Sequence, residues 1–185
     1  SKFSFTPTKG QNKIIANLAN WISEPEYDSV FILNGYAGTG KTTLISAFAT
    51  TLAELRIKPI LLAPTGRAAK VVAQMTGMPA HTIHKKIYRQ KSLADAEARF
   101  MLNFNKEKDA VFIVDEASMI ANSPSESGYY GSGNLLDDLL DEVSSGLAGT
   151  EARDETTILL QVVGDFHRIV LDRSIEPAEE EDHQT

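Results

Sequence analysis

The sequence of 185 residues predicts an α/β domain in which a parallel sheet carries helices on both faces. Apolar runs occur at 29–34, 58–63, 110–115 and 157–165, and none of them alternates with polar residues. Continuous apolar strands are typical of parallel sheets that are buried on both faces. Stretches with helical spacing separate the runs, as the crossovers between parallel strands require.

The helices that connect these strands are expected at about 8–22, 41–55, 66–75, 82–90 and 134–144. The last of them, NLLDDLLDEVS, has apolar residues three and four positions apart. Stretches rich in Ser and Gly at 121–134 and 144–155 predict loops. We therefore expect one domain over residues 1–170 and an acidic, disordered tail over 171–185.

Composition and charge restrict the class of protein. The chain has no cysteine, which excludes disulfides and thiolate metal sites and makes the cytoplasm the expected compartment. No apolar run approaches the roughly 20 residues that cross a bilayer, so we expect a soluble protein without a membrane partner. The net charge of −7 argues against a polyanionic partner, but residues 56–91 hold eight Lys and Arg and no acid. That segment is either a nucleic-acid surface or a solvated face.

A glycine-rich stretch after the first apolar run predicts a phosphate-binding loop. Residues 35–42, GYAGTGKT, fit G-x-x-x-x-G-K-[ST] with a strand before them and a helix after them. Such glycines let backbone N–H groups surround phosphates, Lys41 reaches the β and γ phosphates, and the Thr42 hydroxyl takes a Mg²⁺ position. The predicted nucleotide contacts here are Gly35, Ala37, Gly38, Thr39, Gly40, Lys41, Thr42 and Thr43.

Two acids at the end of the third apolar run predict hydrolysis. Asp115 can hold Mg²⁺ from the carboxyl end of a buried strand, and Glu116 can orient and deprotonate the attacking water. We therefore predict ATP and Mg²⁺ as cofactors, with Lys41, Asp115 and Glu116 as the catalytic residues and Thr42 and Asp115 as the metal ligands.

Over about residues 5–170, the chain resembles the RecD-like branch of superfamily 1 DNA helicases. The resemblance rests on four ordered motifs, NGYAGTGKTT, APTGRAAK (63–70), HTIHK (81–85) and VDEASMI. It implies the N-terminal RecA-like ATPase domain of a helicase, with Gln11 matching the glutamine that recognises adenine. It also implies single-stranded DNA as a partner, contacted by Thr65, Gly66, Arg67, Thr82, His84 and Lys85.

The resemblance accounts for the acid-free segment, because both DNA motifs fall inside it. We accordingly expect Arg67, Lys85 and Lys86 to line a strand path on the carboxyl edge of the sheet.

The sequence departs from the family after its fourth apolar run. VGDFHRIVLD stands where the family has Gly-Asp-x-x-Gln-Leu-Pro, so Asp165 matches and Arg168 replaces the glutamine that senses the γ phosphate. Both residues are still expected at the nucleotide. Family helicases also need a second RecA-like domain, which a longer chain or a partner would supply. Two alternatives remain open, a non-catalytic nucleotide- or DNA-binding remnant and an unrelated P-loop kinase.

Overall fold

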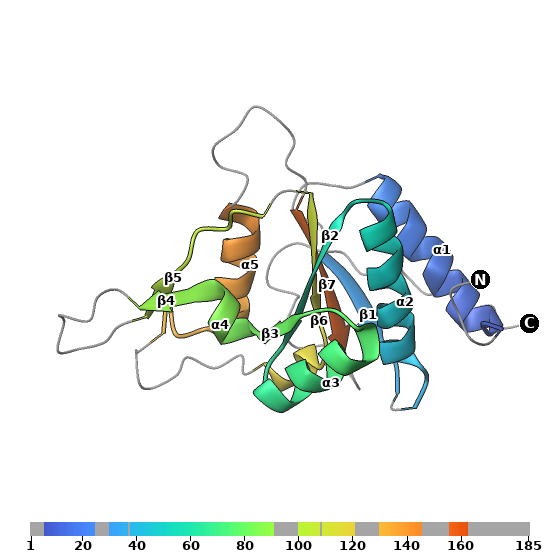
Figure 1. Ribbon diagram of the computed structural model, residues 1–185, viewed down its shortest axis with the longest axis horizontal. Coiled ribbons are helices and arrows are strands. Elements are labelled where there is room, and N and C mark those ends of the chain that lie inside the picture. The colour runs from blue at the N-terminus through green and yellow to red at the C-terminus, as the bar shows by residue number, and fades with distance from the viewer. Residues whose placement is uncertain are drawn as a thin grey trace, which may run out of the picture.

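A parallel sheet forms the centre of the computed structural model, which describes residues 6–24, 30–36, 38–90, 100–107, 109–120, 130–145 and 156–162. Within these residues the sheet has five strands in the order β1-β7-β6-β2-β3, and every neighbouring pair is parallel (Figure 1). The strands are β1 (Val30–Asn34), β2 (Lys58–Ala63), β3 (Ala80–Thr82), β6 (Ala110–Val114) and β7 (Thr156–Val162).

Helices cover both faces of this sheet, as predicted (Figure 1). On one face pack α1 (Lys9–Ser23), α2 (Lys41–Glu54) and α3 (Gly66–Thr76), and on the other α4 (Ile83–Ile87) and α5 (Leu135–Ser145). Alternate strand residues enter the two cores: Ile60 and Leu62 face α4 and α5, whereas Leu61 faces α1 to α3. Burial of β2 and β6 on both faces explains why their apolar runs are continuous.

The predicted helix at 82–90 is wrong at its C-terminal end, because α4 ends at Ile87. Thr82 belongs to β3 and caps the helix, accepting a hydrogen bond from Lys85 N at 3.3 Å. After Ile87 the chain turns into β4 (Tyr88–Gln90), which pairs antiparallel with β5 (Phe100–Leu102). Since β4 and β5 are three residues each, their pattern is too short to distinguish from a helix by periodicity.

The other predicted helices agree with the structure to within two residues. The last strand is described to Val162, so its predicted end at 165 lies outside the described residues, as do 163–185 with the expected domain boundary. Most of the two expected loops also lies outside them. Among the helices that the structure describes, none is long and apolar enough to cross a bilayer.

Candidate nucleotide site

The predicted motifs gather at one edge of the sheet. Because all five strands are parallel, their carboxyl ends meet at the same edge, which is the lower one in Figure 1. The phosphate loop follows β1, Asp115 and Glu116 follow β6, Thr65 follows β2, and Thr82 ends β3. Asp165 and Arg168 follow β7 in sequence but lie outside the described residues, as does Ala37.

The phosphate loop has the backbone that its glycines predict. Gly38 and Gly40 have φ values of +78° and +83°, a region that side chains with a Cβ rarely adopt. Gly40 is the N-cap of α2 and has no side chain to cap the first helical N–H groups. Those N–H groups and the positive end of the helix dipole therefore face the loop and are suited to an anion.

Lys41 is buried within this loop, with only 9% of its surface exposed. Its Nζ donates to the carbonyl oxygens of Gly35 at 2.5 Å and Tyr36 at 2.6 Å. The ammonium group is thus held at the mouth of the loop by neutral acceptors, which phosphate oxygens can replace. Tyr36, which the sequence analysis did not single out, exposes 80% of its surface beside it.

Gln11 joins α1 to the loop. Its Oε1 accepts from Thr8 N at 2.9 Å in a capping box, while its Nε2 donates to Thr39 O at 3.2 Å. A Cβ on Gly40 would lie 3.0 Å from that amide nitrogen. Gln11 and the loop line one hollow of about 240 Å³. The structure therefore brings the predicted adenine residue next to the predicted phosphate site.

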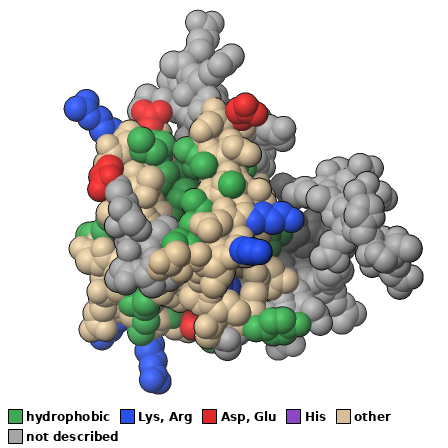
Figure 2. All heavy atoms as spheres, turned by 90° about the vertical axis from the view of Figure 1, so that its right-hand side faces the viewer, with side chains coloured by type: hydrophobic (Ala, Val, Ile, Leu, Met, Phe, Trp, Pro, Cys, Tyr) green, Lys and Arg blue, Asp and Glu red, His purple; other side chains and the backbone are tan. Residues whose placement is uncertain are grey.

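A second hollow lies between α1 and α2, on the face that Figure 2 shows, where apolar side chains gather. It measures about 360 Å³, and Ile15, Ile22 and Phe48 are among its lining residues. Its walls are almost wholly apolar, so phosphates would lose their hydration there without gaining charged partners. The smaller hollow at the loop is the better nucleotide site.

Asp115 and Glu116 stand where β6 ends. Asp115 is 5% exposed, its N–H donates to Leu62 O at 3.0 Å, and its Oδ1 accepts from Glu116 N at 2.9 Å. Glu116 has φ +56° and precedes the 3-10 helix η1 (Ala117–Met119). A non-glycine residue in this region is uncommon and marks a constrained turn. Carboxylate and hydroxyl oxygens such as those of Asp115 and Thr42 are the ligands that Mg²⁺ prefers.

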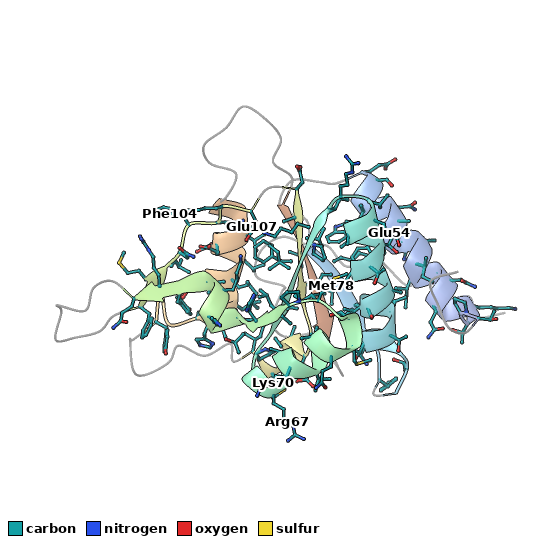
Figure 3. The ribbon with its side chains drawn as sticks, in the orientation of Figure 1. Glu54, Arg67, Lys70, Met78, Phe104 and Glu107 are labelled. Atoms are coloured by element: carbon teal, nitrogen blue, oxygen red, sulfur yellow. The ribbon has the colours of Figure 1, made fainter. Side chains whose placement is uncertain are left out.

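The residues expected at DNA lie at the starts of two helices. Thr65 caps α3 by accepting from Ala68 N at 3.2 Å, and Thr82 caps α4, so both hydroxyls have structural roles that the sequence analysis missed. Gly66, Arg67 and Lys85 are exposed. Figure 3 shows Arg67 and Lys70 on α3, pointing away from the sheet.

His84 packs more closely than the motif suggested. Its ring lies 5.1 Å from the Tyr130 ring and 5.7 Å from the Tyr88 ring, centroid to centroid. Burial lowers the pKa of His84 below its ordinary value of 6.5, so the imidazole is neutral at neutral pH. It therefore supplies no positive charge for a phosphate there.

The expectation that Lys86 lines the carboxyl edge is wrong. Lys86 Nζ lies 2.6 Å from Glu107 Oε1, and Lys58 Nζ lies 2.5 Å from Glu107 Oε2. Lys58 begins β2, so this cluster belongs to the opposite edge of the sheet, as Figure 3 shows for Glu107. An acid from outside the segment 56–91 therefore neutralises part of its charge.

Comparison with known proteins places the chain in a family. Residues 7–127, which include the phosphate loop, Asp115 and Glu116, match the family described as AAA domain. The chain belongs to this family. The AAA domain is 28% identical over 123 residues to the ATP-dependent RecD2 DNA helicase of Deinococcus radiodurans, covering 63% of this chain and 16% of the helicase.

An uncharacterized protein of Methanocaldococcus jannaschii is 38% identical to the AAA domain over 103 residues, which is 49% of this chain and 9% of that protein. The chain thus spans less than a fifth of the length of these curated relatives. The family and the helicase relative bear out the resemblance to the RecA-like ATPase domain of RecD-like helicases.

Proposed function

We propose that this AAA domain binds ATP with Mg²⁺ and hydrolyses it as the motor domain of a DNA helicase. The observation that supports this most strongly is the phosphate loop with its buried Lys41, at the same sheet edge as Asp115 and Glu116. Nucleotide binding and water activation require both sets of groups on one edge.

In this proposal Lys41 exchanges the carbonyl oxygens of Gly35 and Tyr36 for phosphate oxygens, and the first N–H groups of α2 bind the same phosphates. Gln11 meets the adenine from the first turn of α1. Thr42 and Asp115 hold Mg²⁺, which when bound neutralises charge on the phosphates. Glu116 orients the attacking water and accepts its proton.

Single-stranded DNA is proposed to cross the ends of β2 and β3. Thr65 and Arg67 on one helix and Thr82 and Lys85 on the next would contact the DNA backbone, which carries no sequence information. The exposure of Thr65, Arg67 and Lys85 and the helicase relative support this placement. A second RecA-like domain, in a longer chain or a partner, would complete the ATP cleft and the DNA track.

Phosphate release from Mg-ATP, measured with and without oligo-dT, tests the proposal. We expect slow release that the oligonucleotide accelerates. Tight ATP binding with no release under either condition would instead support the non-catalytic remnant, which the replacement of glutamine by Arg168 favours. Absence of both binding and release would refute the proposed function.

A further inference from the structure

A short segment after β5, residues 103–107, connects three separate elements, and we name it the strap. Asn103 N donates to Ile87 O, at the end of α4, at 2.6 Å. Asn105 Nδ2 donates to Val143 O on α5 at 3.3 Å. Glu107 accepts from Lys58 at the start of β2 and from Lys86 on α4. The strap therefore joins α4 to β2 of the sheet and to α5, its neighbour on the same face.

The contact between Glu107 and Lys86 is better fixed than an ordinary surface ion pair. The two side chains are 19% and 24% exposed, and Lys86 Nζ also lies 5.9 Å from the ring centre of the buried Phe112. Glu107 N donates to Asn105 Oδ1 at 3.0 Å, which fixes the backbone that carries the carboxylate. Partial burial and two cationic partners make this pair costly to break from one side.

Burial alone raises the pKa of Glu107, but hydrogen bonds and charge from Lys58 and Lys86 outweigh that effect and lower the pKa. Glu107 is therefore an anion over the neutral range, and it holds Lys86 away from the DNA edge.

The position of α4 depends on such contacts because the helix has only five residues. A helix of that length is not stable by itself in water, so its neighbours set its place. Thr82 caps it and Lys85 lies in it, next to Lys86. The Glu107–Lys86 contact adds to the burial of Ile83 and Ile87 in constraining the backbone that carries the two proposed DNA contacts.

We propose that Glu107 is a positioning residue for DNA binding, which holds α4 through Lys86 so that Thr82 and Lys85 face the strand. The inference rests on the proposed function, because it assumes that α4 contacts DNA. Glu107 itself lies at the opposite edge of the sheet from these proposed contacts (Figure 3).

In Glu107→Gln, the direction of the change in DNA affinity distinguishes the proposal from a purely electrostatic effect. The substitution removes a negative charge and weakens the hold on two lysines, so long-range electrostatics alone predicts tighter DNA binding. The proposal predicts the opposite, a loss of about fivefold in affinity for oligo-dT at low salt, which is a typical coupling between separated sites. Fluorescence anisotropy measures it. Glu107→Ala, which removes both carboxylate oxygens, should lose at least as much.

Lys58→Gln is the matched control. It removes the other partner of Glu107 but changes no residue of α4, and Lys58 is the more exposed lysine, at 60% against 24% for Lys86. We expect its DNA affinity to stay within about twofold of the parent. ATP affinity should be unchanged in both variants, which checks that the fold is intact.

A second measurement, of Glu107→Gln in a Lys85→Ala background, distinguishes the positioning of α4 from a general destabilisation of the protein. Once Lys85 is gone, Glu107→Gln should cost less than about twofold, because the charged one of the two contacts that it positions is absent. An equal loss of affinity in both backgrounds, or tighter binding by Glu107→Gln, overturns the inference but leaves the proposed function standing. If the parent protein binds no oligonucleotide, the DNA part of the proposed function fails and the inference fails with it.

Discussion

Glu142 should make the stability of this protein depend on pH, and Glu142→Gln should remove that dependence. The side chain lies on α5 and is only 3% exposed. Burial raises the pKa of its carboxyl group from 4.5 to about 7, although the charge of Lys86 opposes the rise. Glu142 is thus protonated in the folded protein over a pH range in which the unfolded chain has lost the proton.

The sign and size of the effect follow from these two pKa values. Well below pH 4.5 the carboxyl group is protonated in both the folded and the unfolded state, so folding does not have to bury a charge. As the pH rises toward 7, the unfolded chain binds fewer protons than the folded one, so the free energy of unfolding falls and then levels off. A change from 4.5 to about 7 corresponds to at most roughly 3 kcal/mol. For a chain of this length that is about 6–12 °C in Tm.

Urea unfolding of the parent and of Glu142→Gln, measured between about pH 4 and pH 8, is the assay. The free energy of unfolding of the variant minus that of the parent should rise with pH by up to about 3 kcal/mol. Glu142→Leu should show the same pH trend whatever its absolute stability, because leucine does not titrate either. A difference that is flat or falls with pH would refute the reasoning.

Three other variants, two single and one double, test the site and its edge. Gly40→Ala should destabilise the loop by about 1–2 kcal/mol, because φ is +83° and the new Cβ meets the Gln11 amide, and it should weaken ATP binding; thermal melts and titration check this. Glu116→Gln should keep Mg-ATP bound but stop phosphate release, so equal turnover in parent and variant would remove Glu116 from the mechanism. Arg67→Ala with Lys85→Ala should weaken binding to all oligonucleotides alike. It should also flatten the salt slope by up to roughly 0.7 for each phosphate that the two side chains no longer neutralise, as anisotropy across a salt series would show.

The fold was largely predictable because the central strands β2 and β6 are buried on both faces. Phe112 and Leu62 enter one core, and Val111 and Leu61 enter the other, so the runs that contain them do not alternate with polar residues and stand out in the sequence. The hairpin β4–β5 was not predictable. Tyr88 is buried in the core, and its hydroxyl donates to Asp138 at 2.5 Å, a contact that spans fifty positions and leaves no local signal.

The phosphate loop was the predictable part of the site, because its backbone conformation depends on glycines within one short motif. The glycines around Lys41 imply their own conformation, and the structure has it at Gly38 and Gly40. What the sequence could not reveal is pairing across the fold. The acid-free run suggested a single basic surface, yet Lys86 turns to Glu107, twenty-one positions away. The apolar spacing of α5 likewise gives no sign that Asp138 and Glu142 are buried, and both are.

The measurement that tests the central claim most directly is a calorimetric titration of Mg-ATP into the parent protein and into Lys41→Ala, each with a circular dichroism spectrum to confirm the fold. Lys41 gives a charged hydrogen-bond donor to the phosphates, so we predict saturable binding by the parent and a loss of more than about tenfold in the variant. Equal affinity in the two folded proteins, or no binding by the parent, would contradict the assignment of residues 35–42 as the nucleotide site.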